Sequence, residues 1–271
     1  LLRRFGGDIA SNTIASGVVR IGLATQPVIN LMRDHLLDAD LIYGDETTVQ
    51  VLKEPGRSAQ TKSYMWAQMS GSGPPVRLFA YAPGRGGAHA QRLYAGMRRG
   101  ATLMSDGYEV YNGIARAHGV THLGCWVHAR RPFIAAEEAI PKAARSPKQL
   151  ASQFIALIGK LYRAEALATG WTSERRQRLR GRYSAAVLRA IEKLLLANLH
   201  AVAPSSLLGQ ALHYLNGQWP KLIRFVDNGS WPLDSNPVEN AIRPFVVGRK
   251  GWLFADTVGG ANASANLYSL I

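Results

Sequence analysis

The sequence has a single cysteine, Cys125, among its 271 residues. One cysteine cannot form an intramolecular disulfide, so a disulfide-stabilised secreted domain is excluded and a reducing compartment is favoured. Long apolar runs are also missing. No segment approaches the roughly 20 consecutive apolar residues of a membrane helix, and the opening LLRRFGGDIA lacks the apolar centre of a signal peptide. The sequence therefore predicts a cytoplasmic protein without a membrane partner.

Acidic residues are scarce, with 18 Asp and Glu against 32 Lys and Arg and a formal net charge of +14. A hydrophobic fraction of 47% is typical of a globular chain and excludes a disordered basic tail. A cationic excess favours a polyanionic partner, because each Lys or Arg placed against a phosphate releases condensed counterions. A soluble protein that is merely basic is the alternative.

Motifs of several enzyme classes are missing as well. The glycine-rich GRGG at 84–87 lacks the GK[ST] of a phosphate-binding P-loop, and neither GxSxG nor HExxH occurs. Nucleotide hydrolysis by a P-loop enzyme and zinc proteolysis are therefore excluded. No tyrosine stands out as a recombinase nucleophile.

Helical periodicity comes first along the chain and strands follow. Residues 11–37 place apolar side chains at helical spacing, whereas 41–52, 63–71 and 76–84 are short β-type runs separated by turn clusters. The pattern then predicts a helix over 86–100, a strand over 101–111, a short helix over 111–119 and a strand over 120–127. Three antiparallel strands followed by alternating units predict a mixed five-stranded sheet flanked by helices, the element order of the ribonuclease H-like fold.

Apolar stripes at helical spacing dominate the next hundred residues, with a helix predicted to start at Ser146–Pro147. We therefore expect an α/β fold in which 39–130 and 231–271 form the ribonuclease H-like core. Residues 131–230 are expected to be an all-α insertion before the last core helix, and 1–38 an N-terminal helical segment.

Two acids fall on the predicted sheet. Asp45 lies inside an apolar strand, with Glu46 on the opposite face, and Asp106 closes the run ATLMSD, just before a turn at Gly107. If the first and fourth strands are neighbours, these carboxylates lie on strands about 4.8 Å apart, where a divalent cation such as Mg²⁺ or Mn²⁺ relieves their repulsion. The alternative is that each acid is a strand-end residue paired with an arginine.

The choice of a third acid remains open on spacing alone. The segment DSNPVEN offers Asp234, which ends a loop, and Glu239. Asn236 as N-cap, Pro237 as the first helical residue and Glu239 two residues later also make a plausible capping box, a purely structural role.

Cys125 and His128 form a CxxH pair at the end of the fifth predicted strand. Structural zinc needs four ligands, and the only nearby additions are His118 and His122, so a buried cysteine that packs at the strand end is the favoured interpretation.

Basic residues form several groups along the sequence. The run ERRQRLRGR at 174–182 holds five arginines and is interpreted either as a solvated helix face or as a contact to a nucleic-acid backbone. Arg130 and Arg131, which follow the CxxH pair, are candidates for DNA contacts. Arg243, Arg249 and Lys250 are candidates for DNA contacts beside the acids, and for these three the alternative is a salt bridge to Glu239 or Asp234.

Six motifs appear in the order found in one known family: LIYGDETTVQVL, SDGYEVYN, GCWVHARRPF, LYRAE, LDSNPVENAIRP and GRKGWLFA. Over nearly its whole length the sequence resembles the insertion-sequence-66 family of bacterial DDE transposases. The resemblance implies a ribonuclease H-like catalytic core, and it carries the catalytic, metal-binding triad onto Asp45, Asp106 and Glu239. By the same resemblance Cys125 and His128 mark the start of the helical insertion.

The resemblance further implies two Mg²⁺ or Mn²⁺ ions, cleavage at transposon ends and transfer of the freed 3′-hydroxyl into target DNA. The expected partners are DNA, further copies of the chain and accessory proteins of the element, in the bacterial cytoplasm at the nucleoid. Ser235, Asn240 and Gly251 depart from the family pattern. An inactive DNA-binding remnant and a nuclease without strand transfer are therefore alternatives, and recognition of transposon ends is expected to involve a region outside this chain.

Overall fold

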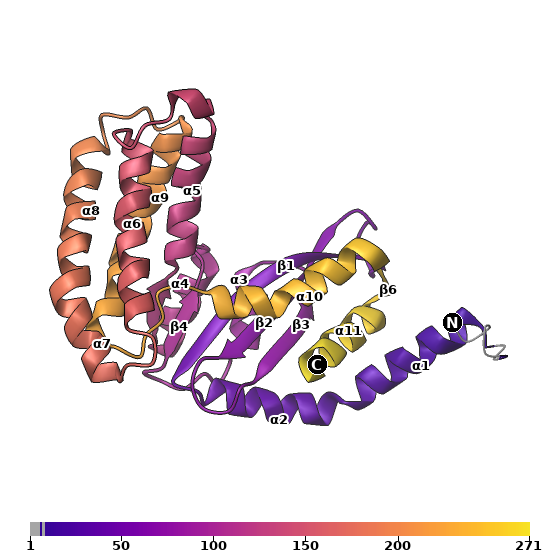
Figure 1. Cartoon of the computed structure of the whole chain (residues 1–271). Coiled ribbons are helices and arrows are strands. Elements are labelled where there is room, and N and C mark those ends of the chain that lie inside the picture. The colour runs from indigo at the N-terminus through magenta and orange to yellow at the C-terminus, as the bar shows by residue number, and fades with distance from the viewer. Residues whose placement is uncertain (1–5, 7–8) are drawn as a thin grey trace. The chain divides into compact units, whose positions relative to one another are not determined.

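The computed structural model describes Gly6 and residues 9–271, which divide into two compact units (Figure 1). Unit 1 contains the described residues up to Leu103 together with Glu109–Thr121 and Asn236–Ile271. Unit 2 contains Met104–Tyr108 and His122–Ser235. The chain therefore passes between the units several times.

The predicted helical segment at 11–37 is two helices, α1 (Ser11–Ala24) and α2 (Gln26–Leu37). They break at Thr25, whose hydroxyl donates to the carbonyl of Gly22 at 2.7 Å. In the described residues no single helix has the length and composition of a membrane span, although α1 and α2 together pass that test as a pair bent by 44°. The α1 helix packs on α11 (Val258–Leu270), where Asn266 donates to the Gly22 carbonyl.

The first three strands form an antiparallel meander of β1 (Leu41–Lys53), β2 (Lys62–Ser70) and β3 (Arg77–Ala82). The strand order is β3-β2-β1-β4-β5, with β4 (Thr102–Ser105) beside β1 and β5 (Thr121–Gly124) at the edge. The predicted α/β class with a mixed sheet is confirmed.

A sixth strand corrects the predicted total of five. In the described part of the chain β6 (Ala255–Thr257) pairs with β1 in parallel, with Val51 opposite Ala255. Most of the motif GRKGWLF before it belongs to α10 (Asn236–Trp252).

Two predicted strands are too long. The prediction over 101–111 is wrong after Ser105, because the Asp106 carboxylate accepts the Tyr108 N–H at 2.9 Å in a turn and α4 (Glu109–His118) follows. The strand predicted over 120–127 ends at Gly124, since α5 (Trp126–Glu138) begins two residues later. Helix α3 (Gly87–Leu93) joins β3 to β4.

Unit 2 is mainly helical. After α5 come α6 (Leu150–Leu167), α7 (Ser173–Leu179), α8 (Ala185–Asn198) and α9 (Leu207–Leu222), with shorter helical turns at Lys142–Ala144, Arg180–Ser184 and Ile223–Asp227. Figure 1 shows α5, α6, α8 and α9 side by side.

The core of this bundle follows the predicted apolar stripes. Phe154, Ile158 and Leu161 of α6 are buried, as are Ile191 and Leu195 of α8. The predicted helix start at Ser146–Pro147 is wrong, because α6 begins at Leu150 after a turn that Gln149 closes on the Ser146 carbonyl.

Candidate functional site

Asp45 is half-buried in the middle of β1. The strand register places Asp45 opposite Ala67 and Ala67 opposite Phe79, so the three side chains share one face of the sheet. The Phe79 ring lies 6.4 Å from that of Phe245 on α10 and 5.9 Å from that of Tyr268 on α11. Helices α10 and α11 therefore cover the face on which Asp45 lies.

Glu239 is half-buried in the first turn of α10. This helix runs in the direction of β1, because Arg249 near its end contacts Thr48 and β6, which follows, pairs in parallel further along β1. The ten residues from Glu239 to Arg249 rise about 15 Å, which corresponds to about four or five strand residues. Glu239 therefore lies at the end of α10 that is remote from the contact between Arg249 and Thr48.

Glu46 lies on the opposite face of β1, with its side chain only 1% exposed. Its carboxylate accepts hydrogen bonds from Arg85 Nε at 2.6 Å and from the Tyr111 hydroxyl at 2.5 Å. Burial, and then the negative charges that include Glu46, raise the pKa of Tyr111. The Glu46 charge is therefore balanced inside the fold, which favours a structural role for this acid.

Asp106, in unit 2, is half-buried directly after β4, the neighbour of β1 in the strand order. One carboxylate oxygen holds the turn through the Tyr108 N–H. Burial and the charge of Asp106 raise the pKa of Tyr214 on α9. Asp234 lies in the same unit, where burial and the charge of Asp234 raise the pKa of Tyr162.

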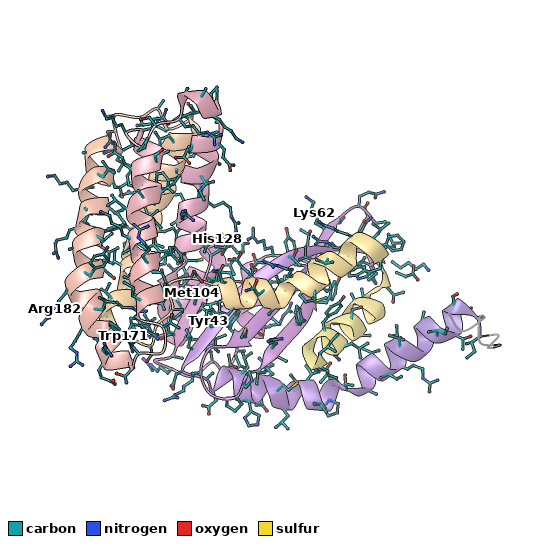
Figure 2. The ribbon with its side chains drawn as sticks, viewed as in Figure 1. Tyr43, Lys62, Met104, His128, Trp171 and Arg182 are labelled. Atoms are coloured by element: carbon teal, nitrogen blue, oxygen red, sulfur yellow. The ribbon has the colours of Figure 1, made fainter. Side chains whose placement is uncertain are left out.

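Cys125 is buried at the start of α5, and His128 lies half-buried in the first turn of that helix (Figure 2). The Cys125 sulfur accepts hydrogen bonds from Ser235 N at 3.3 Å and Ser235 Oγ at 3.2 Å. Burial raises the pKa of the thiol. His122, considered from sequence as a further zinc ligand, is hydrogen-bonded through Nε2 to Ser105 Oγ at 2.8 Å. These contacts favour a packing role for Cys125.

The predicted DNA contacts in unit 1 lie on α10. Arg243 and Lys250 are exposed, whereas Arg249 is half-buried. Arg249 Nη1 donates to the hydroxyls of Thr47 at 3.1 Å and Thr48 at 3.0 Å, and to the Thr48 carbonyl. Arg249 therefore joins α10 to β1.

The predicted DNA contacts in unit 2 differ in exposure. Arg131 is exposed and Arg130 is half-buried on α5. Within the arginine run at 174–182, Arg178 and Arg182 are exposed, but the Arg180 side chain is 1% exposed and bound to Glu165 at 2.7 Å. The run is therefore not a single solvated or DNA-facing surface.

Comparisons with known proteins identify a family. The family model described as "Transposase IS66 family" matches residues 1–263. Two similar proteins of Sinorhizobium fredii (strain NBRC 101917 / NGR234) are named "Uncharacterized protein y4qI" and "Uncharacterized protein y4jD". The first is 28% identical over 281 residues, which cover 99% of this chain and 50% of that protein. The second is 27% identical over 279 residues, which cover 98% of this chain and 53% of that protein. The chain spans about half the length of these relatives.

Proposed function

We propose that this chain, which belongs to the IS66 family of transposases, is the catalytic part of a metal-dependent DNA transposase with a ribonuclease H-like core. Asp45, Asp106 and Glu239 are its proposed metal-binding acids. The observation that carries the proposal is the arrangement in unit 1, where α10 covers the Asp45 face of the sheet and begins with Glu239. By contrast Glu46, the neighbour of Asp45, is engaged with Arg85 on the other face.

The chemistry of these side chains fits a hard divalent cation. Carboxylate oxygens are the ligands that Mg²⁺ and Mn²⁺ prefer. Asp45 and Glu239 are half-buried on regular elements, so they are partly desolvated and held in place. Asp106 follows β4, which neighbours β1. When bound, a pair of such ions activates a water or a 3′-hydroxyl and stabilises the leaving oxygen of a phosphoryl displacement.

The residues of the chain hold and orient the DNA in this reaction. Arg243 lies one helical turn after Glu239 and is exposed, so its guanidinium is available to a phosphate beside the acids. No protein nucleophile is needed. Water attacks the phosphodiester at the transposon end and releases a 3′-hydroxyl, which then attacks a phosphodiester of the target. We propose that copies of the chain act together on paired ends.

The experiment is a cleavage and joining assay with the protein, DNA that carries the ends of its element, and Mg²⁺ or Mn²⁺. We expect Asp45→Asn, Asp106→Asn and Glu239→Gln each to abolish cleavage and joining without loss of folding. The matched control is Glu138→Gln, which removes an exposed acid of α5 and should leave both products unchanged.

Each other outcome has a definite meaning. Normal cleavage by Asp45→Asn contradicts the proposal. If Glu239→Gln cleaves normally and Asp234→Asn does not, the third metal-binding acid is Asp234 and not Glu239. DNA binding without cleavage by the native protein indicates an inactive remnant. Cleavage without joining indicates a nuclease.

A further inference from the structure

A groove of about 480 Å³ opens on unit 1 between the end of α10 and the hairpin of β1 and β2. Its walls include Thr48 and Gln50 of β1, Lys62 of β2, and Arg249, Lys250 and Leu253 at the end of α10. Figure 2 labels Lys62 at this hairpin. The sequence indicated Arg249 and Lys250 as DNA contacts, but it indicated neither Lys62 nor a groove.

The charge of the groove has one sign. Lys62, Arg249 and Lys250 line it, and no carboxylate does so among the described residues. Two acids of adjoining segments are already engaged, because Asp256 pairs with Lys53 at 2.9 Å and Glu54 with an arginine at 2.8 Å. Three cations among threonine and glutamine side chains suit the phosphates of a nucleic-acid backbone.

Leu253 has an unusual backbone at the rim of this groove. It is the one non-glycine residue with positive φ, 65°, in the described part of the chain. This left-handed conformation is unfavourable for a leucine, and glycine would adopt it without strain. Leu253 is nevertheless 61% exposed, between Trp252 at 36% and Phe254 at 42%. Burial of an apolar side chain therefore does not account for the leucine at this position.

We propose that the groove binds the backbone of one DNA strand and that Leu253 is an apolar wedge that enters between two of its bases. The inference rests on the proposed DNA transposase function. Proteins that open or bend DNA insert leucine or other apolar side chains between base steps, and binders of single strands combine a cationic groove with exposed apolar rings. Local strain that is retained beside a binding groove agrees with a functional position.

The first test measures binding without catalysis, in EDTA. The probe is a duplex with a 3′ single-stranded overhang, and its affinity is measured by fluorescence anisotropy over a range of salt concentrations. The double variant Lys62→Ala/Lys250→Ala should lower the slope of log affinity against log salt by about 1.4, since each single-strand phosphate contact contributes about 0.7. The control variant Lys160→Ala/Lys193→Ala removes two exposed lysines of unit 2 and should leave the slope nearly unchanged. An equal effect of both double variants overturns the groove.

The second test places 2-aminopurine at the junction of the same probe, where loss of stacking raises its fluorescence. The native protein should raise the signal, and Leu253→Ala and Leu253→Gly should both remove the rise with the salt slope unchanged. Leu253→Gly also relieves the backbone strain, so its thermal midpoint should be equal or higher and misfolding is excluded as the cause. The control is Leu196→Ala, since Leu196 is also 61% exposed. A full rise with Leu253→Gly overturns the wedge.

The two proposals can fail separately. If Asp45→Asn still cleaves DNA but Lys62→Ala/Lys250→Ala lowers the salt slope as expected, the metal mechanism fails and the groove stands. If Asp45→Asn is inactive and the lysine variant binds like the native protein, the groove fails and the metal mechanism stands.

Discussion

Replacement of Arg180 by alanine should destabilise unit 2 severely. Arg180 Nε and Nη2 bind both oxygens of Glu165 at 2.8 and 2.7 Å. The same guanidinium donates to the carbonyls of Phe225 at 2.7 Å, Asn228 at 2.6 Å and Trp231 at 3.0 Å. One buried cation therefore joins α6 to the segment that follows α9.

The expected magnitude follows from these contacts. Removal of one partner of a buried ion pair costs about 3 to 5 kcal/mol, because the other charge remains buried and uncompensated. The carbonyls that lose a donor place the cost at the upper end of this range. At about 4 °C or more per kcal/mol for a unit of about a hundred residues, the midpoint of thermal unfolding should fall by about 15 °C or more.

Thermal unfolding followed by circular dichroism gives the measurement. Arg178→Ala and Arg182→Ala are matched controls from the same arginine run, and both residues are exposed. Their effects should stay within about 0.5 kcal/mol. Arg180→Lys should not restore stability, because an ammonium cannot reproduce the planar set of donors. If Arg180→Ala unfolds at the native temperature and weakens DNA binding instead, the structural role of Arg180 is refuted.

Three further predictions concern stability. Gly44→Ala should lower the free energy of unfolding in urea by about 1 to 3 kcal/mol, because the added Cβ would lie 2.1 Å from the buried Tyr94 hydroxyl. The control Gly113→Ala, where an added Cβ meets nothing within 4 Å, should be neutral or stabilising. Equal effects of the two substitutions would contradict the prediction. Burial and nearby cations lower the pKa of His122 from 6.5 to about 3. The unfolded chain therefore binds a proton that the native protein does not, so the free energy of unfolding should fall by about 5 kcal/mol in all between pH 6.5 and pH 3. In a series of unfolding curves over this pH range, His122→Gln should reduce that loss. Burial opposes ionisation of Glu54, but hydrogen bonds from Tyr81, Ser63 and Arg57 lower the pKa of its carboxyl group. The stability that Glu54 contributes above the usual carboxyl pKa should therefore disappear as the pH falls through the lowered value. Glu54→Gln should remove this loss of stability in acid, and a pH profile that the substitution leaves unaltered would refute the prediction.

Much of the fold could be predicted from sequence because its elements have clear periodicity. The meander of β1, β2 and β3 alternates around turn clusters, and the stripes of α6 and α8 keep helical spacing to Leu161 and Leu195. Strand β6 could not be predicted, because it has three residues and its stability comes from pairing with the distant Val51. The end of β4 was misplaced because the turn depends on a side-chain contact of Asp106.

The candidate site was only partly predictable, for a related physical reason. Alternation assigned Asp45 and Glu46 to opposite faces of β1, but it carries no information on partners distant in sequence. Arg85 and Tyr111, which hold Glu46, are 39 and 65 residues away from it. Arg180 was likewise grouped with its charged neighbours, although its partner Glu165 is 15 residues earlier. The sequence alone does not distinguish a buried arginine from an exposed one in the same run, because the difference depends on partners that the fold brings close.

A change of metal preference at Asp45 tests the central claim most directly. A carboxylate suits Mg²⁺, whereas a cysteine thiolate is a poor ligand for Mg²⁺ and a better one for softer ions such as Mn²⁺. If Asp45 binds the ion that serves the reaction, Asp45→Cys should fail to cleave end-containing DNA with Mg²⁺ and recover cleavage with Mn²⁺, while the native protein uses both. Cleavage by Asp45→Cys with Mg²⁺ at the native rate would contradict the account.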